Sequence, residues 1–126
     1  MNIPEGLHYS KEHEWARLEG GTVVMGITDY AQGELHDIVY VELPKTGTTV
    51  KQMGKLLVLE TMKAVADVFS PASGEVIAVN ERLLKEPQLI NTAPYGDGWL
   101  VKLKATNAGE LKSLMDAAAY QKFIAK

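Results

Sequence analysis

A series of short segments with strand-type composition, each bounded by turn-forming residues, occupies the chain between Trp15 and Lys104. The segments span residues 15–18, 22–27, 38–43, 56–60, 64–69, 74–79 and 99–104. Short strands at this spacing favour a sandwich or a barrel over a parallel sheet with crossover helices. The sequence therefore predicts a mainly β fold.

Turn residues and alternation refine this prediction. Gly20-Gly21 separates two of the segments and predicts a tight hairpin. In segment 38–43, period-two alternation predicts that Val39, Val41 and Leu43 face the core. Segment 99–104 alternates in the same way, and its predicted inward residues are Trp99, Val101 and Leu103.

Two short helices are predicted between the strands. Thr28 is a suitable N-cap, Asp29 follows in the first turn, and Gly33 is placed to end this helix. Asn80 is placed to cap a second short helix over residues 81–84. Beyond it, Pro and Gly residues predict an irregular connection up to residue 98, which is long enough to suggest function.

The C-terminal segment has helical rather than strand-like spacing. Asn107 and Glu110 are placed like a capping box, and the apolar residues from Ala108 onward fall on one face. The predicted face contains Leu111, Leu114, Met115, Ala118, Ala119 and Phe123. We therefore expect C-terminal helices packed on the sheet.

Length and composition limit the classes of function. A chain of 126 residues with 46% hydrophobic residues predicts one domain, 1–126, with a core at about 20–104 and a helical extension at 106–125. A net charge of -3 without a basic stripe argues against nucleic acid as a partner. No apolar run approaches the ~20 residues that span a bilayer, so no membrane is expected.

Cysteine and targeting signals are also informative. The absence of cysteine excludes disulfides, thiolate nucleophiles and cysteine zinc sites. Residues 1–6 lack the basic start and apolar run of a secretory signal. We expect a cytoplasmic protein if the source is bacterial, and a mitochondrial matrix protein if it is a processed eukaryotic chain.

The pentapeptide from Glu60 to Ala64 (ETMKA) carries the clearest chemical signal. It separates two apolar runs, which places Lys63 at the tip of a tight hairpin. An exposed tip lysine suits a ligase that reads the tip and acylates the amine. The amide also removes the positive charge, so the attached group can enter an apolar pocket at lower cost. Lysines on hairpin tips are also common as ordinary solvated residues.

Catalytic and metal-binding readings are weaker. Alternation in an extended segment would place Glu12 and Glu14 on one side and His13 on the other. The chain lacks a phosphate-binding glycine loop, a zinc-protease helix motif and a nucleophile elbow. A small hydrolase or transferase that uses Glu12, His13 or His36 is the rival from the enzyme class. His8, His13 and His36 lack the spacing of metal ligands, so no metal is predicted.

Several separate blocks resemble the H proteins of the glycine cleavage system, from about residue 7 to residue 124. The blocks are residues 9–15 (YSKEHEW), 26–32 (GITDYAQ), 41–44 (VELP), 63–64 (KA), 70–76 (SPASGEV) and 94–100 (PYGDGWL), followed by the C-terminal helix. Chance agreement over so many blocks is implausible, so the chain is identified as a member of this family.

The resemblance implies a barrel-sandwich hybrid of the lipoyl/biotinyl-domain type, with lipoate in amide linkage to Lys63. It implies a non-catalytic carrier that passes the aminomethyl group of glycine from glycine decarboxylase (P protein) to the aminomethyltransferase (T protein). Dihydrolipoyl dehydrogenase (L protein) would then reoxidise the arm, and a lipoyl ligase or lipoyltransferase would attach it.

The resemblance also implies a cleft into which the loaded arm folds back. Glu12 and Glu14 are the candidates to receive the cationic amine, and Tyr30 is a candidate to line the same cleft. The alternative for the two glutamates is a solvated strand or turn. The alternative for Tyr30 is an aromatic ring that simply packs.

Two positions depart from the family pattern. Thr61-Met62 stands where Ser-Val is usual, and His36 stands where glycine is frequent; we expect His36 to be exposed or partly packed. The pentapeptide alone also fits lipoyl domains of 2-oxoacid dehydrogenases and biotin carriers, although biotin carriers normally have methionine at the position of Ala64. A lipoyl relay to other 2-oxoacid dehydrogenase or redox pathways remains the alternative function.

Overall fold

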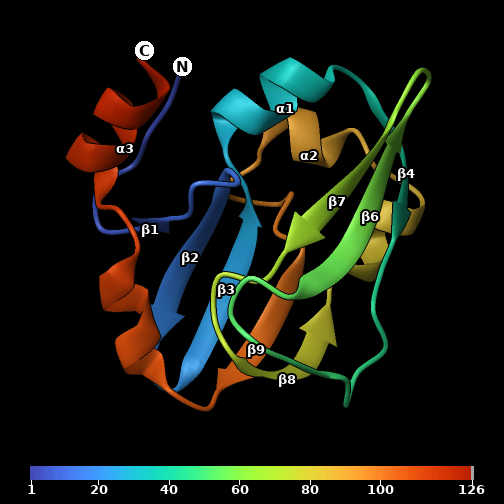
Figure 1. Ribbon diagram of the computed structural model, residues 1–126. Helices are drawn as coiled ribbons and strands as arrows, with labels where there is room; N and C mark the ends of the chain where they lie inside the picture. The colour runs from blue at the N-terminus through green and yellow to red at the C-terminus, as the bar shows by residue number, and fades with distance from the viewer. Residues whose placement is uncertain (126) are drawn as a thin grey trace.

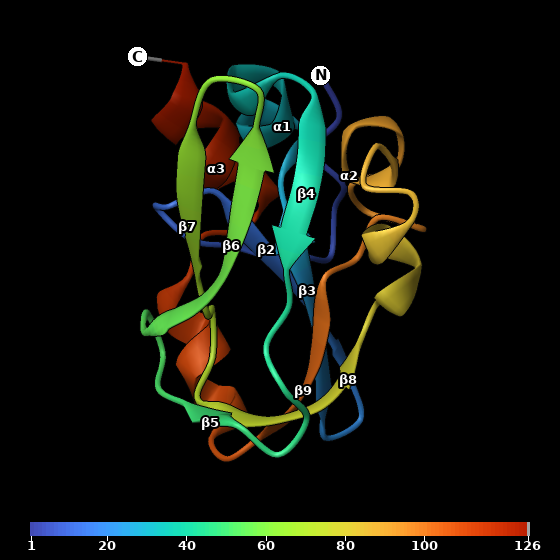
Figure 2. The same cartoon turned by 90° about the vertical axis from the view of Figure 1, so that its right-hand side faces the viewer.

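The computed structural model describes residues 1–125 and contains two antiparallel sheets packed as a sandwich (Figures 1 and 2). The larger sheet has the strand order β1-β2-β3-β9-β8-β5, and the smaller sheet has the order β4-β6-β7. The larger sheet consists of β1 (His8–Tyr9), β2 (Glu14–Glu19), β3 (Thr22–Ile27), β9 (Val101–Ala105), β8 (Gly74–Val79) and β5 (Thr49–Val50). The smaller consists of β4 (Ile38–Glu42), β6 (Lys55–Thr61) and β7 (Val65–Phe69). The predicted mainly β fold is confirmed.

The main core lies between the two sheets. Alternate residues of the facing strands meet there, among them Met25, Val41, Leu59, Val76 and Leu103, all fully buried. Each such side chain stabilises the fold by about 1.5–3 kcal/mol relative to an exposed position. The sandwich is thus held chiefly by apolar burial from both sheets.

The β2–β3 hairpin follows the glycine prediction. Glu19 pairs with Thr22, so Gly20 and Gly21 form a two-residue link. Gly20 has φ 64°, a left-handed conformation that glycine adopts without steric cost. This hairpin aligns β2 with β3 and fixes where the residues before β2 lie.

Two predicted inward faces need correction. Val39 is 45% exposed because the pairing of β4 with β6 is irregular between Ile38 and Tyr40, so Ile38 and Val41 are buried instead. Leu43 is only partly buried. Trp99 precedes β9 and packs, partly buried, in a second apolar cluster, whereas Val101 and Leu103 do face the core.

Helix α1 (Asp29–Leu35) begins as predicted but ends later. The Thr28 side chain accepts a hydrogen bond from the Ala31 N–H at 3.2 Å, which confirms the N-cap. Gly33 lies inside the helix and does not end it. The helix ends at His36, whose φ is 63° and whose N–H donates to the Gln32 carbonyl.

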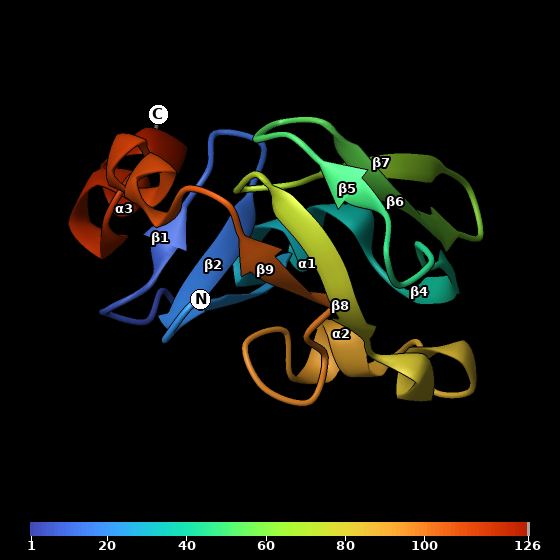
Figure 3. The same cartoon turned by 90° about the horizontal axis from the view of Figure 1, so that it is seen from below.

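The C-terminal segment is two helices separated by an extended break. The 3₁₀ helix η2 (Ala108–Ser113) is followed by Met115, which pairs with Tyr9, and then by α3 (Ala117–Ile124). Asp116 caps α3 through the Ala119 N–H. The break resets the helical phase, so the predictions that Ala118 and Ala119 face inward are wrong, and Ala117 and Tyr120 are buried instead. Figure 3 shows α3 at one side of the molecule, beside β1 and opposite β4 and β6.

The predicted capping box of η2 is confirmed for Asn107, which is the N-cap, and wrong for Glu110. Asn107 accepts from the Gly109 N–H, but the Glu110 carboxylate accepts from the backbone N–H and the hydroxyl of Ser73. The glutamate therefore ties η2 to the start of β8 rather than capping its own helix.

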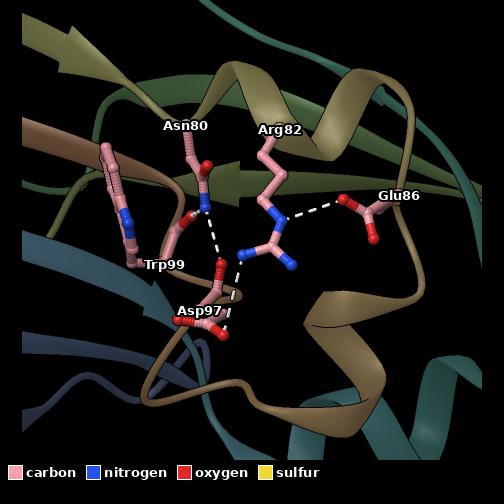
Figure 4. A network of polar contacts seen from close by, with 5 residues as sticks. All are labelled: Asn80, Arg82, Glu86, Asp97 and Trp99. Carbon is pink, nitrogen blue, oxygen red and sulfur yellow. Dashed lines mark hydrogen bonds and ion pairs between the residues drawn. The ribbon is translucent and has the colours of Figure 1, made fainter.

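The connection from β8 to β9 contains η1 (Glu81–Leu84) and the short helix α2 (Leu89–Thr92). Asn80 does not cap η1 through its side chain; its amide donates to the carbonyls of Asp97 and Trp99, each at 2.8 Å (Figure 4). Arg82 contacts Glu86 at 2.8 Å. The amide of Asn80 thus fastens the two ends of this long connection to each other.

No helix within residues 1–125 is long and apolar enough to cross a bilayer.

Candidate functional site

Lys63 lies at the tip of the hairpin between β6 and β7, which projects beyond the body of the smaller sheet (Figures 1 and 2). The Thr61 N–H donates to the Ala64 carbonyl at 2.9 Å. The Thr61 hydroxyl oxygen accepts from the N–H groups of Lys63 and Ala64, at 3.2 and 3.0 Å. A side chain that satisfies turn N–H groups in this way fixes the backbone that carries the lysine.

Thr61 and Met62, which depart from the family pattern, have different roles in the turn. The hydroxyl of Thr61 makes the turn contacts, and serine would supply the same hydroxyl. Met62 is 83% exposed and projects away from the core. Met62 therefore contributes surface at the tip rather than packing.

A cavity of about 320 Å³ lies directly beside the tip. It is lined by the end of α1, the residues that follow it and the hairpin: Glu34, Leu35, His36, Asp37, Thr61, Met62, Lys63 and Ala64. His36 is exposed, as expected, and lines this cavity together with the residues of the tip.

A second cavity, of about 290 Å³, lies between α1, the residues that precede β2, and β7. Its lining includes all three predicted cleft residues, Glu12, Glu14 and Tyr30. Glu34 and Leu35 line both cavities, so the two adjoin along α1. The tip of the hairpin and the predicted cleft residues therefore border two adjoining cavities. We call the cavity lined by Glu12, Glu14 and Tyr30 the arm cleft.

Glu14 is the most unusual group of the arm cleft. Its residue is 1% exposed, and no cation pairs with it among residues 1–125. Burial raises the pKa of its carboxyl to about 7, while hydrogen bonds from the Ser10 hydroxyl and the Phe69 N–H oppose the rise. With a pKa of about 7, the Glu14 carboxyl gains or loses its proton near neutral pH.

His13 borders the same cavity, and its predicted placement was wrong. It lies in a turn before β2, with φ 71°, and not in an extended segment opposite the glutamates. Its Nδ1 lies 2.9 Å from the Tyr120 hydroxyl, and its ring lies 4.8 Å from that of Tyr30. Burial lowers the pKa of His13, and Glu12 and Glu34 oppose this.

Sequence reasoning missed several residues of the arm cleft. Glu34 and Asp67 add carboxylates to its lining, and the Ser10 hydroxyl donates a hydrogen bond to the Glu14 carboxyl. Asp67 had a signal, because aspartate is depleted in strands and this one interrupts an apolar segment. Ser10 and Glu34 had none, since serine and glutamate are ordinary in turns and on helix surfaces.

Comparison with known proteins gives a consistent result. A sequence model described as "Glycine cleavage H-protein" matches residues 7–126. The chain is 51% identical to the glycine cleavage system H protein of Symbiobacterium thermophilum, covering 97% of this chain and 95% of that one. It is 49% identical to that of Methylacidiphilum infernorum, covering 98% and 97%.

A solved structure agrees with these sequences. The crystal structure of a glycine cleavage system H protein from Mycobacterium marinum superimposes with a TM-score of 0.89 at 36% identity, covering 98% of this chain and 100% of that chain. The match therefore extends over both sheets and the C-terminal helices. The chain belongs to the glycine cleavage H-protein family.

Proposed function

We propose that this chain is the lipoyl carrier of the glycine cleavage system, with lipoate in amide linkage to the Nζ of Lys63. The observation that carries the proposal is the exposed lysine on a turn fixed by Thr61, in a chain of this family. An amine held at a projecting tip is accessible to a lipoyl ligase or lipoyltransferase. The residues around Lys63 fit the group because the turn leaves its side chain in solvent beside a cavity.

The protein's own residues then hold and release the arm. The dithiolane of lipoate supplies the sulfur chemistry that accepts the aminomethyl group of glycine. Conversion of the Lys63 ammonium to an amide removes a charge whose burial would be costly, so the arm can lie along α1. The adjoining cavities at Glu34 and Leu35 provide the route from the tip to the arm cleft.

In the arm cleft, Glu14 and Glu12 would receive the cationic amine of the cargo, and the Tyr30 ring would border it. Glu14 is buried, and none of the ion pairs among residues 1–125 involves it, which favours a positively charged visitor. Glu12 is exposed at the rim and adds negative charge there. These positions support a cleft that shelters the loaded arm from solvent.

The partners would be glycine decarboxylase, the aminomethyltransferase and dihydrolipoyl dehydrogenase, which the arm visits in turn. The chain would act as their shared, non-catalytic substrate, and the carrier would work in the cytoplasm of a bacterial host. The bacterial relatives support this setting.

Peptide mass spectrometry of the protein from its native host tests the proposal. A lipoyl increment on the Lys63 peptide, absent from Lys63→Arg and retained in Lys45→Arg, is the expected result. Lys45 is a matched control because it is exposed on a loop outside the tip. A biotinyl increment would assign the chain to the carboxylase carriers, and a bare Lys63 under lipoate-replete conditions would overturn the proposal.

A further inference from the structure

Ser10 closes the turn that leads into β2. Its backbone N–H donates to the Glu14 carbonyl at 2.9 Å, and its carbonyl accepts from the His13 N–H at 3.1 Å. Ser10 is only 1% exposed. Its side chain is therefore held in one position against Glu14.

The Ser10 hydroxyl both accepts a hydrogen bond from Glu14 and donates one to it. Its oxygen accepts from the Glu14 backbone N–H at 3.0 Å, and its hydrogen is donated to Oε1 of the Glu14 carboxyl at 2.5 Å. The other carboxyl oxygen, Oε2, accepts from the Phe69 N–H at 3.2 Å. Both oxygens thus receive donors, which is the arrangement that an ionised carboxylate prefers.

The charges that face Glu14 make these donors important. Glu12 precedes β2, Glu34 projects from α1, and Asp67 projects from β7, and all three line the same cavity. The titratable groups that complete this surrounding are His13, Tyr30 and Tyr120. Burial disfavours a charged Glu14 most, the charge of Glu12 adds to this, and a donor to the carboxyl oxygens opposes both. Asp67 is itself paired with Lys55 at 3.3 Å.

Only one of the two donors can be changed by side-chain substitution. The Phe69 N–H belongs to the backbone of β7, whereas the Ser10 hydroxyl can be removed without altering a strand. The Ser10 hydroxyl is therefore the donor to Glu14 whose contribution a substitution can test.

We propose that Ser10 is a positioning residue of the arm cleft, whose hydroxyl keeps the Glu14 carboxylate ionised and oriented to receive a cationic amine. The inference rests on the proposed function, because the amine is the cargo of the arm. Without the hydroxyl, Glu14 stays in the cleft but remains protonated up to a higher pH. A protonated carboxyl loses the ionic attraction for an ammonium group.

The direct test is an NMR titration of the Glu14 side-chain carboxyl in the lipoate-free protein. Ser10→Ala is expected to raise the proton affinity of Glu14 about tenfold, because a hydrogen bond to a charged group is lost. Ser10→Thr keeps the hydroxyl and is expected to stay close to the native titration. An unchanged titration in Ser10→Ala would overturn the proposal.

Ser70→Ala is the matched control. Ser70 is equally buried, but its hydroxyl donates to the Ala72 carbonyl at 2.7 Å and is not among the hydrogen-bond partners of Glu14 within residues 1–125. This variant is expected to leave the Glu14 titration unchanged. If it raised the proton affinity of Glu14 as much as Ser10→Ala does, Ser10 would have no specific role. If Ser10→Ala does not fold, Ser10→Cys, with its weaker S–H donor, is expected to give a smaller rise in the same direction.

A second readout uses the lipoylated protein charged with aminomethyl cargo. The lifetime of the cargo at pH 7 is expected to shorten several-fold in Ser10→Ala, and the deficit to narrow toward pH 8.5 as Glu14 ionises in both proteins. A deficit independent of pH would indicate a merely structural role and overturn the proposal. Failure to load any cargo would refute the proposed function instead, while the titration in the lipoate-free protein would still decide the role of Ser10.

Discussion

The hydroxyl groups of Thr28 and Tyr120 lie 2.7 Å apart although the two residues are separated by 92 positions in the chain. Thr28 caps α1, and Tyr120 projects from α3. The same Tyr120 hydroxyl contacts His13 at 2.9 Å. One phenol thus joins the last helix to the start of α1 and to the wall of the arm cleft.

Tyr120→Phe is expected to destabilise the protein by about 1–2 kcal/mol, because the buried Thr28 hydroxyl and the His13 ring lose a partner. Urea unfolding measures the loss. Tyr40→Phe is the matched control, since Tyr40 is 48% exposed and is expected to change stability by less than about 0.5 kcal/mol. Equal losses in the two variants would show that the Tyr120 hydroxyl contributes no specific link.

Glu14 is expected to make stability depend on pH. Its pKa is raised to about 7 in the folded protein, so the folded state binds its proton more tightly than the unfolded state does. The resulting stability is fully present below the unfolded pKa and is lost as the pH rises through about 7. The loss amounts to about 3 kcal/mol at most, by the conversion of a pKa difference to free energy.

Denaturant unfolding of Glu14→Gln at pH 5 and pH 8 tests this expectation. The glutamine cannot ionise, so the native protein should lose stability relative to this variant as the pH rises. Glu42→Gln, the same substitution at an exposed position on β4, is the matched control. Parallel pH dependence in native protein and Glu14→Gln would show that Glu14 titrates near its ordinary value.

Thr61→Ala is expected to slow attachment of lipoate to Lys63, because the turn loses the oxygen that accepts from two of its N–H groups. Thr61→Ser keeps the oxygen and is expected to be modified at close to the native rate. Mass spectrometry over time with a purified ligase gives both rates. Equal rates for alanine and threonine would mean that the ligase does not depend on this turn conformation.

Two glycines are expected to respond in opposite ways to alanine. A Cβ at Gly74 would lie 2.3 Å from the Lys104 carbonyl oxygen, where the paired strand leaves no space. Gly74→Ala should therefore destabilise the protein by several kcal/mol, on the order of the largest single-residue effects. Gly33 lies in α1 with open space around it, so Gly33→Ala should stabilise by about 0.5–1 kcal/mol. Thermal unfolding of the pair distinguishes steric exclusion from helix propensity.

Local chemistry made much of the fold predictable. The Gly20-Gly21 hairpin and the Thr28 cap depend on neighbouring residues alone, and both were confirmed. Errors arose where a distant contact decided the outcome. Met115 pairs with Tyr9 and interrupts the C-terminal helix, and the Asn80 amide turns to the carbonyls beyond it in the chain.

The candidate site divides in the same way. The place of Lys63 at a hairpin tip was predictable because a tip is a local feature, and its role as the attachment residue stays a prediction that came from the family resemblance. The partnership of Ser10 with Glu14 was not predicted, because the Glu14 carboxyl also accepts from the Phe69 N–H, 55 positions away, and both residues are buried by the tertiary fold. Charge and size in the sequence do not reveal which carboxyl will be buried.

The contacts of Tyr120 with Thr28 and His13 also affect the order in which parts of the protein form during synthesis. The hairpin that carries Lys63 closes within residues 55–69, so a nascent chain can present it early. His13, which borders the arm cleft, contacts Tyr120, 107 positions later in the chain, so this contact forms only after α3 has been synthesised. Under the proposed function, a chain that lacks α3 would present the complete attachment hairpin but would have no finished shelter for the cargo. Modification and protection would then mature at different moments of synthesis.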